Sequence, residues 1–164
     1  MLSAFIQDPQ LPEMNEKDTG AIIKASYLYN FAKYIDWPES EKQGNFVISI
    51  MGGDNLYQEL VGNYNSKQIG LQQIEIRKLS KTLKISDCHI IYVGKEYQDL
   101  LPEIAEKFKG TPTLVVSDGA ESLDSGSAVA FVWQDNNWLF DLKSGNVESL
   151  YIGSTLKSLA RKVD

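Results

Sequence analysis

Apolar and polar positions first mark out a helix between Ala21 and Pro38. Its apolar side chains recur at steps of four and three residues, which keeps them on one face of a 3.6-residue turn. They are Ala21, Ala25, Leu28, Ala32 and Ile35. Pro38 ends the helix, because its ring lacks an N–H and disfavours helical geometry at Trp37. We therefore expect an apolar helix over 21–38 with Trp37 at its exit.

Four aromatic side chains occupy other positions of this helix, at Tyr27, Tyr29, Phe31 and Tyr34. A helix that only packs on a sheet needs less aromatic area. Because aromatic residues are enriched at protein interfaces, part of this area is predicted to meet a second surface.

Three nearly continuous apolar runs, at 46–51, 88–93 and 113–116, are typical of strands covered on both faces. The alternation over 68–79 slips once, which predicts a strand with a bulge or two short strands. Two further strands, 128–133 and 138–142, are expected to form a hairpin.

Helical segments separate or follow these strands. We expect helices over 55–64, capped by Asp54; over 96–109, in two parts around Pro102; and over 154–163, capped by Ser154. The last helix would carry Leu156, Leu159, Ala160 and Val163 on one side. This order predicts an α/β fold in a single domain: a mixed, mainly parallel sheet of about six strands flanked by helices, with a C-terminal hairpin and helix.

Length and charge narrow the function classes. A chain of 164 residues with 43% hydrophobic content fits one core, and a net charge of -6 disfavours binding to nucleic acid or anionic lipid. No apolar run approaches the roughly 18 residues of a membrane helix, so direct membrane insertion is not expected.

The first residues allow two interpretations. Leu2 to Ile6 is apolar but has no basic residue before it, which by itself favours a cytoplasmic protein. It is equally consistent with the remainder of a trimmed export signal. We expect residues 1–20 to be a flexible leader or signal-peptide remnant and 21–164 to form the domain.

Candidate chemistry is sparse. Cys88 and His89 are the only cysteine and histidine, which excludes an internal disulfide and a structural zinc site of Cys and His ligands. Neighbours on a strand point to opposite faces, so a Cys–His dyad is not expected. We predict that Cys88 is a small core residue and that His89 bonds to backbone or a carboxylate.

Two glycine turns follow buried strands. Gly52-Gly53-Asp54 lacks the G-x-G-x-x-G pattern, and its carboxylate would compete with a phosphate for N–H donors. Gly94-Lys95 has no P-loop pattern around it. A capped turn is the simpler interpretation of the first, and a solvated lysine of the second.

Asp118 ends a predicted strand, where open α/β sheets bind ligands, and Asp36 and Asp141 could add charge nearby. A metal or acid/base site stays open beside the simpler roles of cap and surface residue. The Gly-x-Ser-x-Gly motif is absent. We therefore predict a binding or interaction module without catalytic residues, metal or cofactor.

Six separated segments, in this order, resemble the YfiR-like family of periplasmic proteins. They are SYLYNFAKYIDWP (26–38), FVISIMGGD (46–54), CHIIYVG (88–94), TLVVSDG (113–119), VAFVWQDNNWLFDL (129–142) and STLKSLARKV (154–163). The resemblance implies an exported, often dimeric, non-catalytic domain. It also implies a partner, the periplasmic sensor region of an inner-membrane diguanylate cyclase, which the family's regulators repress, with effects on cyclic-di-GMP and biofilm formation.

Some members of the family respond to redox state through disulfides. Here Ser49 stands where a paired cysteine is common, which leaves Cys88 as a redox candidate only through an intermolecular link. The residues expected to contact the partner or a ligand are Asn30, Lys33, Tyr34, Trp37 and Asp118, each of which has a structural alternative. The alternative function is a small-ligand sensor with a pocket at the strand ends; an enzyme would require activity that depends on Asp118 or Cys88.

Overall fold

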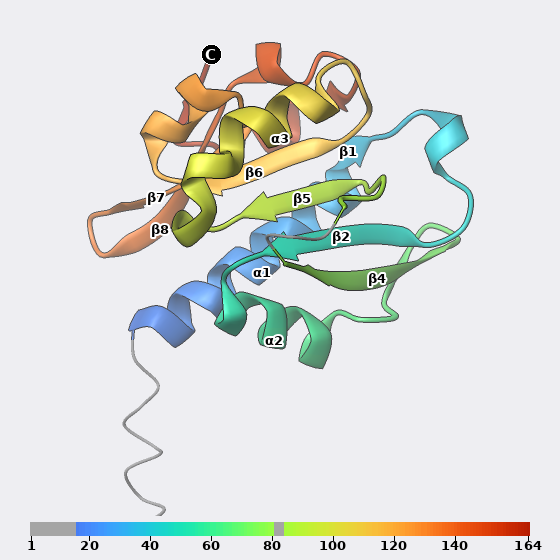
Figure 1. Ribbon diagram of the computed structural model, residues 1–164, viewed down its shortest axis with the longest axis horizontal. Coiled ribbons are helices and arrows are strands. Elements are labelled where there is room, and N and C mark those ends of the chain that lie inside the picture. Colours follow the sequence, from blue (N-terminus) through green and yellow to red (C-terminus); the bar gives the residue numbers. More distant parts are fainter. Residues whose placement is uncertain (1–15, 81–83) are drawn as a thin grey trace, which may run out of the picture.

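A computed structural model describes residues 16–80 and 84–164 (Figure 1). Its main sheet has eight strands in the order β10-β8-β7-β6-β5-β2-β4-β3. These strands are β2 (Phe46–Met51), β3 (Gln68–Ile69), β4 (Gln72–Leu79), β5 (Ile90–Val93), β6 (Leu114–Asp118), β7 (Val129–Gln134), β8 (Asn137–Leu142) and β10 (Lys162–Val163). The expected α/β class is confirmed, with eight strands in the sheet in place of about six.

Helices cover both faces of the sheet (Figure 1). The α-helices are α1 (Glu16–Tyr34), α2 (Asp54–Asn63), α3 (Leu101–Phe108) and α4 (Ser154–Leu159), and the longer 3-10 helices are η3 (Lys95–Leu100) and η4 (Ala120–Ser125). Buried residues of α1, α2 and α4 share one core cluster, whereas those of α3 belong to the cluster on the other face. The helical segment 96–109 is in two parts, as predicted.

The strand order reverses between β2 and β5. From β2 the chain passes through α2 to the parallel strand β4 on one side, and then crosses to β5 on the other side. β6 and β7 continue the parallel order, and β8 returns antiparallel. In open α/β sheets, the carboxyl ends of the two strands at such a reversal form a crevice suited to binding.

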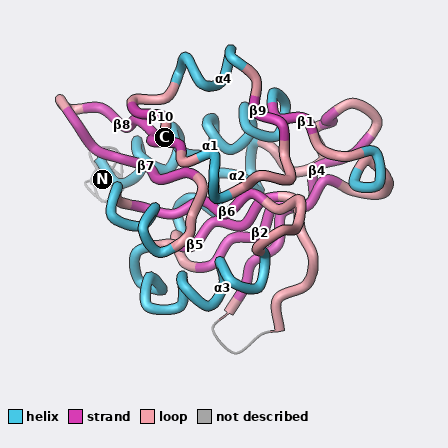
Figure 2. Tube along the Cα trace, turned by 90° about the horizontal axis from the view of Figure 1, so that it is seen from above, coloured by secondary structure: helices cyan, strands magenta, loops and turns pink. Residues whose placement is uncertain are grey.

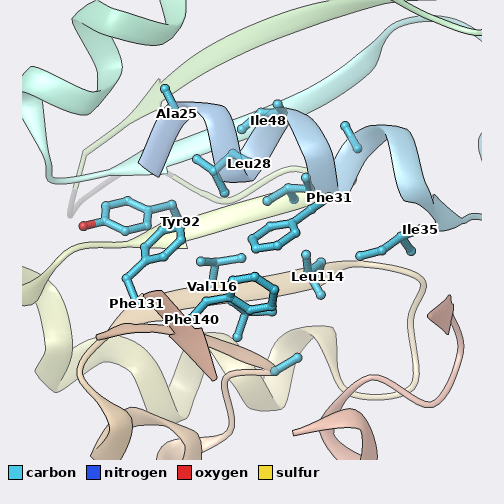
Figure 3. Packing of buried hydrophobic residues seen from close by; sticks show 14 of the residues in the cluster. Ala25, Leu28, Phe31, Ile35, Ile48, Tyr92, Leu114, Val116, Phe131 and Phe140 are labelled. Atoms are coloured by element: carbon cyan, nitrogen blue, oxygen red, sulfur yellow. The ribbon is translucent and has the colours of Figure 1, made fainter. Parts of the chain in front are cut away.

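The predicted apolar stripe lies in the core. All five residues of the stripe are buried, from Ala21 to Ile35. Phe31 of α1 packs against Phe131 and Phe140, with ring centroids 6.4 and 5.0 Å away (Figure 3). Burial of these three rings, each at most 1% exposed, makes α1 part of the core as well as part of the surface.

The helix differs from the prediction at both ends. α1 begins at Glu16, and it ends at Tyr34 because the chain then enters β1 (Ile35–Asp36). β1 pairs antiparallel with β9 (Tyr151–Ile152) in a separate two-stranded sheet (Figure 2). Backbone pairing with a distant segment therefore stops the helix before Trp37.

The C-terminal helix is shorter than predicted. α4 ends at Leu159, and residues 161–164 turn to pair with β8. Leu156 is buried, but Leu159 and Val163 are 55% and 43% exposed, so the expected four-residue apolar side does not form. Neither expected cap is present: the N-cap positions of α2 and α4 are Gly53 and Gly153.

Other predictions are confirmed. The segment 68–79 forms the two strands β3 and β4. β7 and β8 form the hairpin, closed by Asp135 and Asn136 with φ of 53° and 61°. Two positive φ angles give the turn whose twist matches that of paired strands.

Candidate functional site

Three of the five predicted contact residues lie on one side of α1. Asn30 lies opposite the buried Ala21 on the helix, since nine residues turn an α-helix by about 180°. Lys33 is exposed, and Tyr34 is 50% exposed. Ile22, 41% exposed, adds apolar area toward the N-terminal end. We call Ile22, Ser26, Asn30, Lys33 and Tyr34 the outer face of α1.

Trp37 lies in the core. Its side chain is 5% exposed and its indole N–H donates a hydrogen bond to the Pro112 carbonyl at 3.0 Å. The ring meets the edge of Phe46, with centroids 5.0 Å apart. Trp37 therefore has the structural role that was its alternative. Its side chain fixes the segment after α1 to the sheet.

Asp118 is the centre of a partly buried polar network. Its Oδ1 accepts a hydrogen bond from Lys24 Nζ at 3.0 Å, and its Oδ2 accepts one from the Tyr92 hydroxyl. The Lys24 and Asp118 side chains are each only 13% exposed. Lys24 Nζ also lies 4.0 Å from the ring centroid of Trp138, a cation–π contact.

The network keeps the Tyr92 hydroxyl protonated. Burial, and next the adjacent Asp118 carboxylate, hold the Tyr92 pKa well above its usual 10. The phenol therefore stays neutral at neutral pH and donates a hydrogen bond to Asp118. Figure 3 shows the Tyr92 ring among the core residues beneath α1. Both Asp118 oxygens are used inside the protein, which makes this residue an internal link between α1 and the sheet.

A hollow of about 330 Å³ opens beside this network, at the carboxyl ends of β2, β5 and β6. Lys24, Tyr92, Asp118 and Trp138 form part of its wall. The Trp138 indole N–H is buried with no hydrogen-bond partner in the described part of the chain. This strand-end hollow coincides with the reversal of strand order, as the fold class leads one to expect.

The glycine turn after β2 already holds a carboxylate. Glu96 Oε2 accepts a hydrogen bond from the Gly53 N–H at 3.1 Å. A Cβ on Gly52 or Gly94 would lie 2.7 or 2.6 Å from the Glu96 carboxyl group, so glycine is needed for this approach. Glu96 thus occupies the donor that a phosphate would use, in keeping with the absence of a phosphate-binding motif.

The other two acids do not join Asp118. Asp36 is exposed and pairs with Lys42 at 3.3 Å. Asp141 is buried and receives two hydrogen bonds from Arg161, at 2.8 and 2.6 Å. Neither acid is part of the Asp118 network, because each is paired with a basic residue outside it. No group of three or more Cys, His, Asp or Glu suited to a metal occurs among residues 16–80 and 84–164.

Cys88 and His89 point to opposite faces, as predicted. His89 stacks on Phe46 in the α1 layer, while Cys88 belongs to the core cluster beneath α3. The His89 ring accepts from the Val47 N–H at 3.1 Å and lies 2.7 Å from the Glu41 carbonyl, so the backbone satisfies it. Burial raises the Cys88 thiol pKa to about 11, although the neighbouring Ser49 hydroxyl opposes this rise.

Sequence reasoning missed Lys24, Tyr92 and Trp138 as members of the network. One signal was present: Lys24 is the only charged residue between Asp18 and Lys33 in an otherwise apolar and aromatic helix. A lysine beside a buried stripe is expected to have a carboxylate partner, because burial of an unpaired charge is costly. The partner could not be identified from sequence, because Asp118 lies 94 residues away.

Comparison with known proteins gives one result. A family model described as YfiR/HmsC-like matches residues 21–161. No curated protein matches the chain. In the described part of the structure, the helices are too short or too polar to cross a membrane.

Proposed function

Because the chain belongs to the YfiR/HmsC-like family, we propose that it is a non-catalytic periplasmic protein that binds and represses an inner-membrane diguanylate cyclase. The family connects the protein with the regulation of diguanylate cyclase signalling. The finer proposal is that it captures the cyclase's periplasmic sensor region and so lowers cyclic-di-GMP and biofilm formation. The match over 21–161 is the observation that carries this proposal.

The outer face of α1 supports action by binding. Asn30, Lys33 and Tyr34 lie on this side, and no acidic residue occurs between Thr19 and Ile35. An aromatic ring that is half exposed, next to an unburied lysine and an amide, has the composition of a protein contact surface. We propose that this face contacts the sensor region while the opposite side of α1 holds the core.

The network at Asp118 gives this face a fixed position. Lys24 joins α1 to the end of β6, and the Tyr27 hydroxyl donates to the Trp138 carbonyl at 3.0 Å. A contact surface carried on an anchored helix loses little conformational freedom on binding. We further propose that residues 1–20 are a leader or the remainder of an export signal, that 21–164 form the periplasmic domain, and that the domain can form a homodimer.

Deletion of the gene, with measurement of cellular cyclic-di-GMP and affinity capture of membrane proteins, tests the proposal. We expect cyclic-di-GMP to rise in the deletion strain and the wild-type protein to capture a diguanylate cyclase. The variant Asn30→Ala plus Tyr34→Ala should fail to restore repression. The matched variant Glu103→Ala plus Lys107→Ala, on α3, should restore it.

Unchanged cyclic-di-GMP together with no captured cyclase would refute the regulator proposal. Sedimentation of the purified chain tests the dimer separately. If the chain stays monomeric at concentrations that saturate the cyclase, dimerisation is not part of its action.

The strand-end hollow favours a second candidate, a small-ligand sensor. A ligand that enters it would lie against Lys24 and Tyr92, and so next to the link between α1 and the sheet. Saturable stabilisation in a thermal-shift screen of nucleotides, amino acids and peptides is the expected result for a sensor. A flat response across these classes would count against this candidate and leave the regulator proposal intact.

A further inference from the structure

Tyrosine rings and lysine ammonium groups alternate across the junction of α1 with the turn after α2. We call Tyr29, Lys33, Tyr34, Tyr64 and Lys67 the tyrosine–lysine cluster. The Tyr29 and Tyr64 ring centroids are 5.2 Å apart. Lys67 Nζ lies 5.1 Å from the Tyr64 centroid and 5.6 Å from that of Tyr29, and Lys33 Nζ lies 5.6 Å from Tyr29 and 5.3 Å from Tyr34.

The two ammonium groups share one aromatic ring, that of Tyr29. Among the described residues, no carboxylate lies within ion-pair distance of Lys33 or Lys67, as is also true of Lys107 and Lys109, whereas Lys24 and Lys78 each have one such carboxylate and Lys42 has two. The rings attract the ammonium groups and hold them in place. Two like charges held around Tyr29 create a local positive potential that an anion would relieve.

The charge distribution of the sequence makes this cluster distinct. Asp and Glu outnumber Lys and Arg by 22 to 16 in the chain. Nevertheless, neither 19–35 nor 60–74, the two segments that build the cluster, contains a single acidic residue. The cluster is therefore a cationic and aromatic surface on an acidic protein, which favours a partner of opposite charge.

We propose that the tyrosine–lysine cluster binds an acidic polypeptide segment, with carboxylates at Lys33 and Lys67 and side-chain stems packed on the tyrosine rings. Two lysines are fewer than the four to eight of a typical lipid-binding basic cluster. The inference rests on the proposed function only in taking the partner to be a protein.

Nuclear magnetic resonance of the isotope-labelled full chain tests this directly. The probe is a short synthetic peptide of alternating Glu and Ala, and its neutral counterpart has Gln in place of Glu. We expect the acidic peptide alone to shift the amides around Tyr29, Lys33 and Lys67, with an affinity that falls as salt is raised. Shifts confined to other surfaces, or equal shifts with both peptides, would overturn the proposal.

Matched variants separate local from general charge effects. Lys33→Gln plus Lys67→Gln should weaken peptide binding about five- to tenfold, as expected for loss of two exposed charge pairs. Lys107→Gln plus Lys109→Gln makes the same charge change at the C-terminal end of α3, where Lys107 also lies over an aromatic ring, and should leave binding unchanged. An equal loss in both variants would refute the assignment.

Two further measurements separate this inference from membrane binding and from the regulator proposal. If phosphatidylglycerol vesicles bind through the cluster and the acidic peptide does not, the partner is a membrane and the proposal is wrong. If the Lys33→Gln plus Lys67→Gln variant captures the cyclase as well as the wild type, the inference fails while the regulator function stands. If the peptide binds but no cyclase is captured, the inference stands and the regulator proposal fails.

Discussion

Cys88 is buried beside Ser49, and burial raises its thiol pKa to about 11. At pH 8 only about one thiol in a thousand would then be ionised, whereas an exposed cysteine would be about one-quarter thiolate. We therefore expect native Cys88 to react with a thiol reagent at least 100-fold more slowly than the urea-unfolded chain does. Rapid labelling of the native protein would show that the thiol is accessible and would support its role as a redox site.

The Lys24–Asp118 pair carries a second prediction at this scale. Both side chains are 13% exposed, so loss of either partner leaves a charge with little solvent. In a double-mutant cycle with Lys24→Met and Asp118→Asn, we expect a coupling free energy of about 1–3 kcal/mol from urea unfolding. Additive effects, within about 0.3 kcal/mol, would mean that the two residues do not stabilise the fold together.

At the scale of elements, the buried strands, the α1 stripe and the hairpin could be predicted, because each has several residues in a regular pattern. β1, β9 and β10 could not, since strands of two residues leave no pattern in the sequence. The predicted C-terminal end of α1 and the predicted length of α4 were wrong, because backbone pairing with distant segments competes there with helix propensity. Asp118 was flagged by its place at a strand end, but its partners come from elements far away along the chain.

The C-terminal tail depends on a buried carboxylate. Asp141 is 2% exposed and holds Arg161, which in turn donates to Gln134 at 2.6 Å. Asp141→Asn should lower the free energy of unfolding by about 1–3 kcal/mol, because charge-assisted bonds are lost from a buried position. The control Asp124→Asn, at an exposed pair 4.0 Å from Lys143, should change it by less than about 0.5 kcal/mol. Equal effects in urea titrations would contradict this ranking.

The β7–β8 turn offers a stabilising change. Asn136 has a φ of 61°, a conformation that glycine adopts without steric cost. Asn136→Gly should therefore raise the unfolding free energy by up to about 1 kcal/mol, because turns of this kind prefer glycine in the second central position. Thermal unfolding followed by circular dichroism would detect the change; a lower midpoint would argue against the turn geometry.

For the whole molecule, two buried groups that can lose a proton, the Cys88 thiol and the Tyr92 phenol, set the alkaline limit of stability. Cys88 and Tyr92 both have raised pKa values, so their neutral forms are favoured in the folded state. The unfolded chain loses these protons first, at about pH 8.5–10, so stability is complete below that range and falls as pH rises toward 11. Cys88 alone accounts for about 2–3 kcal/mol of this loss. Stability that stays constant between pH 7 and 10.5, by urea titration, would be inconsistent with these shifts.

The contacts of α1 also determine when the molecule can fold. Tyr27 bonds to Trp138, 111 residues away, and Phe31 packs on Phe131 and Phe140. Contacts between such distant residues require a long loop to close first, which slows folding. During synthesis, the side of the helix that carries Tyr27 and Phe31 therefore stays uncovered until the last hairpin has been made. Most of the chain, up to the end of β8, must therefore exist before this part of the core can close.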